Sequence, residues 1–357
     1  MKTTVKLAQI CLLTLPALAN AQFTFTTNSD GSLNIYQYTG SGGTVTIPDA
    51  TNGLPITSIG TNAFENATFS SVTIPDSITS IGDWAFYGTG LTNLIIPDSV
   101  VTIGQNAFSY CQNLTSIVIG TNVTDLPSGV FVGCSGLTNV TIPNSVTNIG
   151  DWAFGLCYAL PSVIIPNSVT IIGNGAFNDC GNLTNITIGS NVASIGSNAF
   201  VQCANLLNVT FPASVTNIGH NAFGVCPNLV SFCFLGNAPN ADSTVFSGAG
   251  FFGYGYTAVV YYLPNTTGWY SPFGGVPAFL WNASIQTANS SFGIQNNQFG
   301  FNITGTTNMI ILVEACTNLA NPTWTLLLIG PLTGGSIYFS DSQWTNYPSR
   351  YYRISPE

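Results

Sequence analysis

The sequence predicts a mostly-β solenoid followed by a small antiparallel β-sandwich, and two patterns support the solenoid. A phenylalanine recurs from position 64 to position 223 at spacings of 22, 22 and then five times 23 residues. Between these phenylalanines, apolar and polar residues alternate in short runs, which is the period of a half-buried strand. A repeat of this length indicates stacked coils, about nine here, that bury their apolar side chains against one another.

The first segment of the 357-residue chain has the features of an export signal. Lys2 and Lys6 precede an apolar run over residues 7–18. Ala19-Asn20-Ala21 then has the small-x-small pattern of a cleavage site. The apolar run is too short to span about 30 Å of hydrocarbon. We therefore expect residues 1–21 to be a signal peptide cleaved after Ala21, and no transmembrane segment in the rest.

One repeat unit shows how a coil is built. Residues 137–142 alternate as a short strand, and Pro143 ends it because proline lacks an N–H. Gly150 is expected to allow a turn at positive φ, and Asp151 to cap a short helical turn that ends at the interior Phe154. The same Ile-Gly-x-x-Ala-Phe motif begins at Ile59, Ile81, Ile103, Ile149, Ile172, Ile195 and Ile218.

This unit resembles the BspA-like, or Treponema pallidum-type, leucine-rich repeat. The pattern xLxxVxIPxSVTxIGxxAFxxC is complete over residues 137–157. Residues 30–60 are similar to the N-terminal cap of that family, and residues 258–281 to its closing segment. The resemblance implies one leucine-rich repeat solenoid with both caps over residues 22–283.

Two columns of side chains are expected inside the coils. The first holds Phe86, Phe108, Phe154, Phe177, Phe200 and Phe223. The second holds Cys111, Cys134, Cys157, Cys180, Cys203 and Cys226, each three residues after the repeat phenylalanine. Export favours disulfides, but Cβ atoms stacked about 4.8 Å apart exceed the roughly 3.8 Å that a disulfide prefers. We favour buried thiols over disulfides, and both over zinc.

The alternate strand residues are expected to point outward in two columns, which run from Ser71 to Ser231 and from Thr73 to Cys233. One interpretation is a broad binding face, as solenoids commonly present on one side. The other is that these residues are simply good strand formers or tolerate water. The candidate binding residues are Ser116, Asn139, Thr141, Ser162, Asn185, Thr187, Asn208 and Thr210.

Composition excludes several functions. Only 5% of residues are charged, and no Lys or Arg lies between Lys6 and Arg350, which excludes a nucleic-acid footprint. His220 is the single histidine and is expected on the surface. Trp84 and Trp152 are expected to be at least half-exposed contact points. We expect no catalytic residues, no metal and no cofactor.

The C-terminal residues 284–357 form a different pattern. Apolar runs at 299–304, 309–316, 324–329 and 351–354 are typical of strands separated by Gly and Asn clusters. They predict a small β-sandwich, loosely similar to fibronectin-like modules. Glu314 and Arg353 are expected to pair across two of its strands.

The family resemblance implies a secreted or cell-surface bacterial protein that adheres to an unidentified extracellular protein or glycan and is not an enzyme. The alternative is a structural component of the cell envelope or extracellular matrix. Cleavage after Ala21 leaves 13 acidic residues against two arginines, a net charge of −11. Because this charge is sparse, we expect binding to depend weakly on salt.

Overall fold

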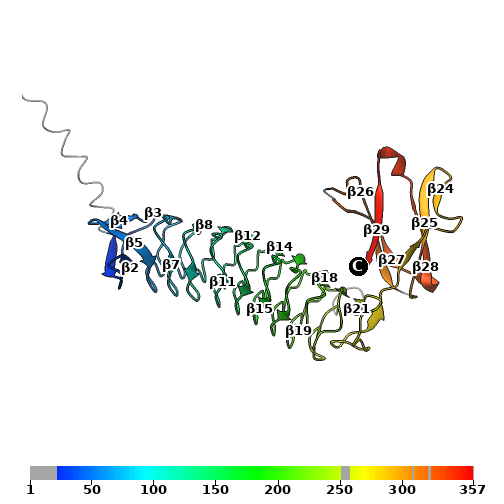
Figure 1. Cartoon of the computed structure of the whole chain (residues 1–357), viewed down its shortest axis with the longest axis horizontal. Coiled ribbons are helices and arrows are strands. Elements are labelled where there is room, and N and C mark those ends of the chain that lie inside the picture. The colour runs from blue at the N-terminus through cyan, green and yellow to red at the C-terminus, as the bar shows by residue number, and fades with distance from the viewer. Residues whose placement is uncertain (1–21, 251–257, 308, 321–322, 357) are drawn as a thin grey trace, which may run out of the picture.

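The computed structural model describes residues 22–250, 258–307, 309–320 and 323–356. The expected signal peptide, residues 1–21, lies outside the described residues. The expected fold class is confirmed: stacked coils form an elongated β-solenoid, and antiparallel sheets follow at its C-terminal end (Figure 1). None of the helices in the described ranges is long and apolar enough to cross a membrane.

A small N-terminal sheet covers the first coil. Its strands are β1 (Phe23–Thr27), β2 (Leu33–Tyr38), β4 (Ala50–Thr51) and β5 (Leu54–Ile59). β1 is antiparallel to β2, whereas β2 and β5 are parallel and start the stacking. The ring of Tyr38 stacks on Phe64 with ring centroids 5.2 Å apart. The cap therefore closes the open end of the apolar core.

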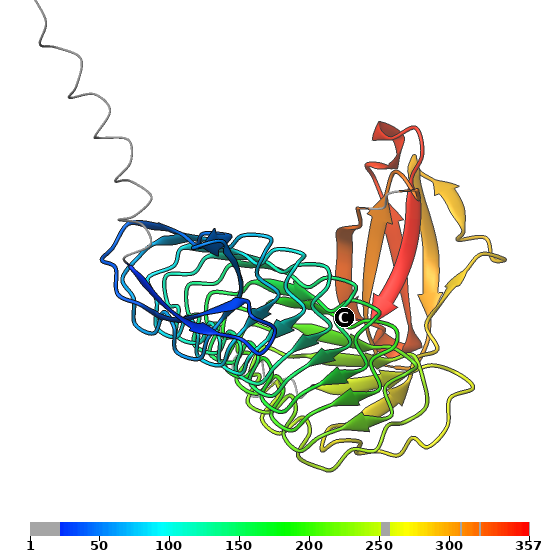
Figure 2. The ribbon, with the colours of Figure 1, turned by 60° about the vertical axis from the view of Figure 1, so that its left-hand side comes forward.

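Two parallel ladders of short strands run along the solenoid. The first ladder contains β3 (Thr44–Thr46), β6 (Ser71–Thr73), β8 (Asn93–Ile95), β10 (Ser116–Val118), β12 (Asn139–Thr141), β14 (Ser162–Ile164), β16 (Asn185–Thr187), β18 (Asn208–Phe211), β20 (Ser231–Phe234), β21 (Val259–Tyr262) and β22 (Ala278–Leu280). The second, continuing from β5, contains β7 (Ser80–Ile81), β9 (Thr102–Ile103), β11 (Asp125–Leu126), β13 (Asn148–Ile149), β15 (Ile171–Ile172), β17 (Ser194–Ile195) and β19 (Asn217–Ile218). Figure 2 shows these strands side by side along the stack.

The turn after each second-ladder strand differs from the helical turn that the sequence suggested. Trp152 has φ +57°, in the left-handed region, which no α-helix contains. Ala153 N–H donates to Gly150 O inside the turn, but the N–H groups of Trp152 and Phe154 donate to carbonyls of the next coil. Because alternate donors are used by the neighbouring coil, the turn cannot wind into a helix.

Gly150 and Asp151 also have roles other than those expected. The φ of Gly150 is not positive. A Cβ on Gly150 would lie 2.7 Å from the carbonyl oxygen of Leu126, so glycine is needed because adjacent coils approach closely there. Asp151 does not cap its own turn; its Oδ1 accepts the backbone N–H of Asn174 in the next coil at 2.6 Å. Both residues join coils rather than shape one coil.

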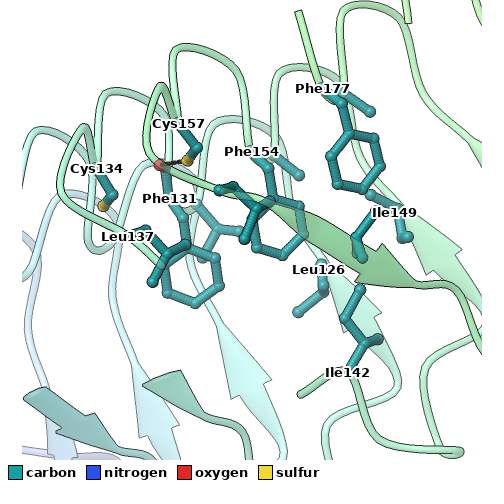
Figure 3. Close-up of a cluster of buried hydrophobic side chains, with 14 of the residues drawn as sticks. Leu126, Phe131, Cys134, Leu137, Ile142, Ile149, Phe154, Cys157 and Phe177 are labelled. Atoms are coloured by element: carbon teal, nitrogen blue, oxygen red, sulfur yellow. Dashed lines mark hydrogen bonds between the residues drawn. The ribbon is translucent and has the colours of Figure 1, made fainter. Parts of the chain in front are cut away.

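The core is a column of phenylalanine rings, part of which is drawn in Figure 3. From Phe64 to Phe223, successive rings stack with centroids 4.7 to 5.6 Å apart and interplanar angles of at most 24°. All of them are buried. Phe246 continues the sequence spacing, but its ring is tilted by 38° against Phe223. The regular stack therefore ends where the closing segment begins.

The cysteine column lies beside these rings. Every described cysteine is free and buried. Each thiol of the column donates to the carbonyl oxygen of the phenylalanine in the preceding coil, at 3.2 to 3.4 Å. Figure 3 shows one such bond, from Cys157 to Phe131. Burial raises the pKa of Cys180 and of Cys226 to about 12. The thiols thus connect successive coils as neutral donors.

The C-terminal residues form two antiparallel sheets around a second core. One sheet contains β23 (Ser284–Gln286), β24 (Gly293–Gln295), β25 (Gln298–Thr304) and β28 (Ser336–Asp341), and the other β26 (Ile310–Cys316), β27 (Thr325–Pro331) and β29 (Tyr351–Pro356). Two three-residue 3₁₀ turns, Thr333–Gly335 and Trp344–Asn346, lie in the connections. The four expected strands are present. Three strands, β23, β24 and β28, were not predicted because they are short or rich in polar residues.

Candidate binding face

The candidate binding residues lie on the outer side of the first ladder. In β14, Val163 is buried while Ser162 and Ile164 on either side of it are exposed, as period-2 alternation requires. All eight candidates are exposed except Ser116, which is half-buried. Parallel register places Ser116 beside Asn139 and Ser162 beside Asn185. The face is therefore a continuous, uncharged surface of amides, hydroxyls and methyl groups.

Three aliphatic side chains interrupt the threonine column of this face. Ile95 and Ile164 are 67% and 71% exposed, and Val118 is also exposed. Isolated exposed aliphatic residues are normal, but here they lie in one column among β-branched threonines. The column offers an apolar strip bordered by hydrogen-bonding groups, a composition that suits macromolecular recognition.

The outward columns end earlier than expected. Ser231 and Cys233 were expected to point outward into solvent, but both are buried. Tyr261 of β21 is paired with Cys233, and its ring belongs to the second core, which also contains Phe301 and Leu332. The C-terminal sheets therefore cover this end of the first ladder, so the free face stops at β18.

A row of threonines at one border of the face was missed by sequence reasoning. Thr115 precedes β10 and Thr138 precedes β12, and the hydroxyl of each donates to the backbone carbonyl of the threonine one coil earlier, at 3.0 and 3.1 Å. Thr147 and Thr170, beside the second ladder, do the same. Their recurrence every 23 residues was the available signal. Each of these hydroxyls donates its single proton within the protein and links two coils, so only its oxygen, as an acceptor, remains for a ligand.

The single histidine does not form a relay. His220 Nδ1 lies 3.2 Å from Asp242 Oδ2 and 2.9 Å from Thr244 Oγ1. A nucleophile–histidine–carboxylate relay uses both ring nitrogens, one for each partner. Here both partners contact the same nitrogen, and the imidazole is exposed. The contact links neighbouring coils at the solvent boundary.

Two tryptophans of the turns, Trp84 and Trp152, are exposed, as expected. Trp84 contacts Tyr87 with ring centroids 5.2 Å apart, and Tyr87 contacts Tyr110 at 5.6 Å. Trp152 has the same φ of +57° as Trp84 and lies over Gly175 of the next coil. The turns thus carry an aromatic cluster that is separate from the strand face.

The two arginines are the only cations in the part of the chain that the structure describes, and both are paired. Arg353 Nε donates to Glu314 Oε2 at 2.7 Å, which confirms the expected pair. Arg350 Nε lies 2.6 Å from Asp341 Oδ2 and forms an ion pair with it, but the geometry is not that of a hydrogen bond. Neither guanidinium is available to attract an anionic ligand to the solenoid.

Comparison with known proteins agrees with this repeat architecture. A profile of the "BspA type Leucine rich repeat region" matches residues 33–160 and 124–251, in six copies. A leucine-rich repeat protein of T. pallidum is 28% identical, with a TM-score of 0.45, over 58% of this chain and 88% of its own. A leucine-rich cell surface protein of Faecalibacterium prausnitzii is 24% identical over 68% of this chain and 93% of its own, with a TM-score of 0.30. The pneumococcal vaccine antigen PcpA is 18% identical over 68% of this chain and 78% of its own, with a TM-score of 0.35. A search of curated proteins finds no match.

Proposed function

The chain belongs to the BspA-type leucine-rich repeat family, and on that premise we propose that it is a secreted or cell-surface, non-enzymatic binding protein. Its solenoid, residues 22–283, recognises an extracellular protein or glycan, and residues 284–357 form a separate β-sandwich module. The eight candidate residues of β10 to β18 form the contact surface. No catalytic step is assigned to any side chain.

The observation that carries this proposal is the uncharged face of the first ladder. Ile95 and Ile164 are about two-thirds exposed on a rigid surface whose backbone is fixed by hydrogen bonds between coils. A rigid surface loses little conformational entropy on binding. Exposed β-branched side chains then supply apolar contact, and neighbouring Asn and Thr supply hydrogen bonds.

Matched substitutions on the two ladders test the proposal. The purified protein is screened against arrays of extracellular proteins and glycans, and the affinity of each hit is measured for Ile164→Arg and Ile171→Arg. Both isoleucines are exposed, but Ile171 belongs to β15 of the second ladder. We expect Ile164→Arg to weaken binding by about tenfold or more, because a charge would interrupt the apolar strip. Ile171→Arg should leave it unchanged.

The competing role is a structural component of the cell envelope or matrix. Self-association of the purified protein in solution, without saturable binding to any array member, would favour that role and contradict the proposal. Equal loss of binding in both isoleucine variants would place the contact elsewhere than on the first ladder.

A further inference from the structure

The turns near the N-terminal end of the solenoid carry an exposed aromatic cluster that the first-ladder face does not include. It consists of Trp84, Tyr87 and Tyr110, whose rings are in successive contact with centroids 5.2 and 5.6 Å apart. Trp84 and Tyr110 are 40% and 41% exposed. Because Tyr110 belongs to the coil after that of Trp84, the aromatic cluster extends over two coils.

The ring of Tyr110 lies flat on the backbone of the next coil. A Cβ built on Gly133 would lie 2.8, 3.0 and 3.2 Å from three adjacent atoms of this ring. Such nearly equal distances place Gly133 over the face of the ring and not at its edge. One face of Tyr110 is thus covered by a glycine, which leaves the opposite face to a ligand.

A carboxylate lies beside these rings. Glu65 and Tyr87 each follow a repeat phenylalanine, and the rings of Phe64 and Phe86 stack with centroids 4.7 Å apart. In the same register, the N–H of Asn66 donates to the carbonyl oxygen of Tyr87 at 2.7 Å. Glu65 is exposed, and among the described residues its side chain is paired only with the neutral amide of Asn66, at 3.4 Å. Its negative charge therefore has no cationic partner there.

The arginines of the C-terminal module show what such an arrangement holds. Cζ of Arg350 lies 4.2 Å from the centroid of the Tyr347 ring, and Cζ of Arg353 lies 4.3 Å from that of Trp324. Each guanidinium is also paired with a carboxylate. A ring and a carboxylate together stabilise a guanidinium because the ring face and the anion both attract its charge. The aromatic cluster and Glu65 offer the same two groups without the guanidinium.

The charge of the solenoid favours a cationic partner. Of the 13 acidic residues, only Glu314, Asp341 and Glu357 lie outside the solenoid, whereas residues 22–283 contain no Lys or Arg. The two arginines of the C-terminal module are already paired. A cation for the aromatic cluster therefore comes from another molecule, and the acidic solenoid attracts it.

We propose that the aromatic cluster and Glu65 form a second contact region, which binds arginine side chains on a basic segment of a protein partner. Guanidinium planes stack on the outward faces of the rings, and Glu65 accepts their N–H groups. This inference rests on the proposed binding function and adds a partner class to it.

The test is calorimetric titration of the purified full-length protein with a hexaarginine peptide at low ionic strength. We expect saturable binding that weakens about tenfold or more in Trp84→Asn, because the stacking surface is lost. Asparagine is chosen because Asn62 and Asn106 already occupy this left-handed position in neighbouring coils, so the melting temperature should not change. Added salt should weaken the binding, and hexalysine should bind less tightly because an ammonium group does not stack as a guanidinium does.

Trp152→Asn is the matched control for the ring. Trp152 has the same φ of +57° and is 42% exposed. In the coil before it, however, Val132 occupies the position that Glu65 has in the coil before Trp84. Without that carboxylate, Trp152 should contribute little, and Trp152→Asn should bind hexaarginine as the unmodified protein does.

A second pair of variants separates the contact region from general attraction to an acidic protein. Glu65→Gln and Asp98→Asn each remove one negative charge, but Asp98 lies at the corner between the two ladders, away from the turns. Asparagine is tolerated at that corner, because Asn167 accepts the N–H of Ser190 as Asp98 accepts that of Thr121. We expect Glu65→Gln to weaken hexaarginine binding severalfold and Asp98→Asn to leave it nearly unchanged.

Four results would overturn the inference. They are equal binding in Trp84→Asn and the unmodified protein, equal weakening by Glu65→Gln and Asp98→Asn, tighter binding of hexalysine than of hexaarginine, and binding of a neutral glucose hexasaccharide without binding of hexaarginine. The first-ladder proposal is judged separately, by the effect of Ile164→Arg on an array hit. Its failure and the failure of the second contact region are therefore distinguishable.

Discussion

At the residue scale, the buried thiols make the free energy of unfolding fall as the pH rises above about 9. An unperturbed thiol titrates near pH 9, but burial raises the pKa of Cys180 and of Cys226 to about 12. Above pH 9 the unfolded state loses these protons while the folded state keeps them. The stabilisation is therefore complete below pH 9 and declines as the pH rises toward 12, by about 1.4 kcal/mol per pH unit for each thiol.

We predict that the urea concentration at the unfolding midpoint decreases as the pH is raised from about 9 to about 10.5. In Cys180→Ala this decrease per pH unit should be smaller by the contribution of one thiol. Alanine is the matched replacement because Ala67 and Ala249 occupy the same position in other coils. Tyrosines also titrate in this range, so the comparison with Cys180→Ala is the decisive measurement. An identical slope in both proteins would contradict a buried neutral thiol.

We expect substitution of the two arginines of the C-terminal module to reduce folding stability by different amounts. The side chains of Arg350 and Asp341 are only 10% and 5% exposed, and the Tyr352 hydroxyl also donates to Asp341. Arg350→Met leaves a buried carboxylate without its cation and should cost about 3–5 kcal/mol. Arg353 is 46% exposed, so Arg353→Met should cost about 1 kcal/mol or less despite its contact with the Trp324 ring.

Urea denaturation of both variants gives this comparison directly. Destabilisation by Arg353→Met equal to that by Arg350→Met would show that burial does not govern these pairs.

At the scale of the coil, the corner glycines determine how closely repeats stack. Gly150→Ala places a Cβ 2.7 Å from the Leu126 carbonyl oxygen, and because that neighbour is backbone, the coils must separate. We expect a loss of about 1–3 kcal/mol. At Gly181 a Cβ meets nothing within 4 Å, so Gly181→Ala should be neutral or stabilise by about 0.4–1 kcal/mol.

Thermal unfolding of these two single variants shows whether glycine is needed at Gly150 because adjacent coils are in close contact there, or only because of its backbone freedom. Similar melting temperatures for Gly150→Ala and Gly181→Ala would remove close approach as the reason for the glycine column.

The strands of the coil were predictable, but the turn was not. Alternation in 137–142 and the position of Pro143 predict β12 because both depend only on local sequence. The residues after Gly150 suggested a helix because Asp and Ala favour helix starts and interiors. The hydrogen-bond partners of Trp152 and Phe154 lie in the next coil, and no property of a single repeat contains that information.

At the scale of the whole molecule, the solenoid strand β21 contributes side chains to the core of the C-terminal sheets. Tyr261 belongs to a solenoid strand and is buried among Phe301, Ile303 and Leu332. A protein ending at residue 283 would expose this ring and Cys233. We expect it to melt at a lower temperature and to self-associate on size-exclusion chromatography.

Tyr261 and Cys233 are then both replaced by threonine in the truncated protein, because threonine already occupies the outward column at Thr210. We expect this variant to be monodisperse. A truncated protein that is already monodisperse and as stable as the full chain would show that the sheets do not protect this end.

Only part of the candidate face could be predicted from the sequence. The outward direction of Asn139, Thr141 and Asn185 follows from strand alternation alone. The burial of Ser231 and Cys233 does not, because the segment that covers them lies far along the chain.

The repeat, the inward column of phenylalanines and the cysteine column were predictable because each depends on spacing along the chain, and the sparse charge follows from composition. The partners across coils became known only from the stacking: the left-handed turns, the thiol-to-carbonyl bonds, the close contact at Gly150 and the covered end of the face. These partners lie outside any single repeat, because alternate N–H groups of each turn donate to the next coil and each coil buries its apolar side chains against its neighbours.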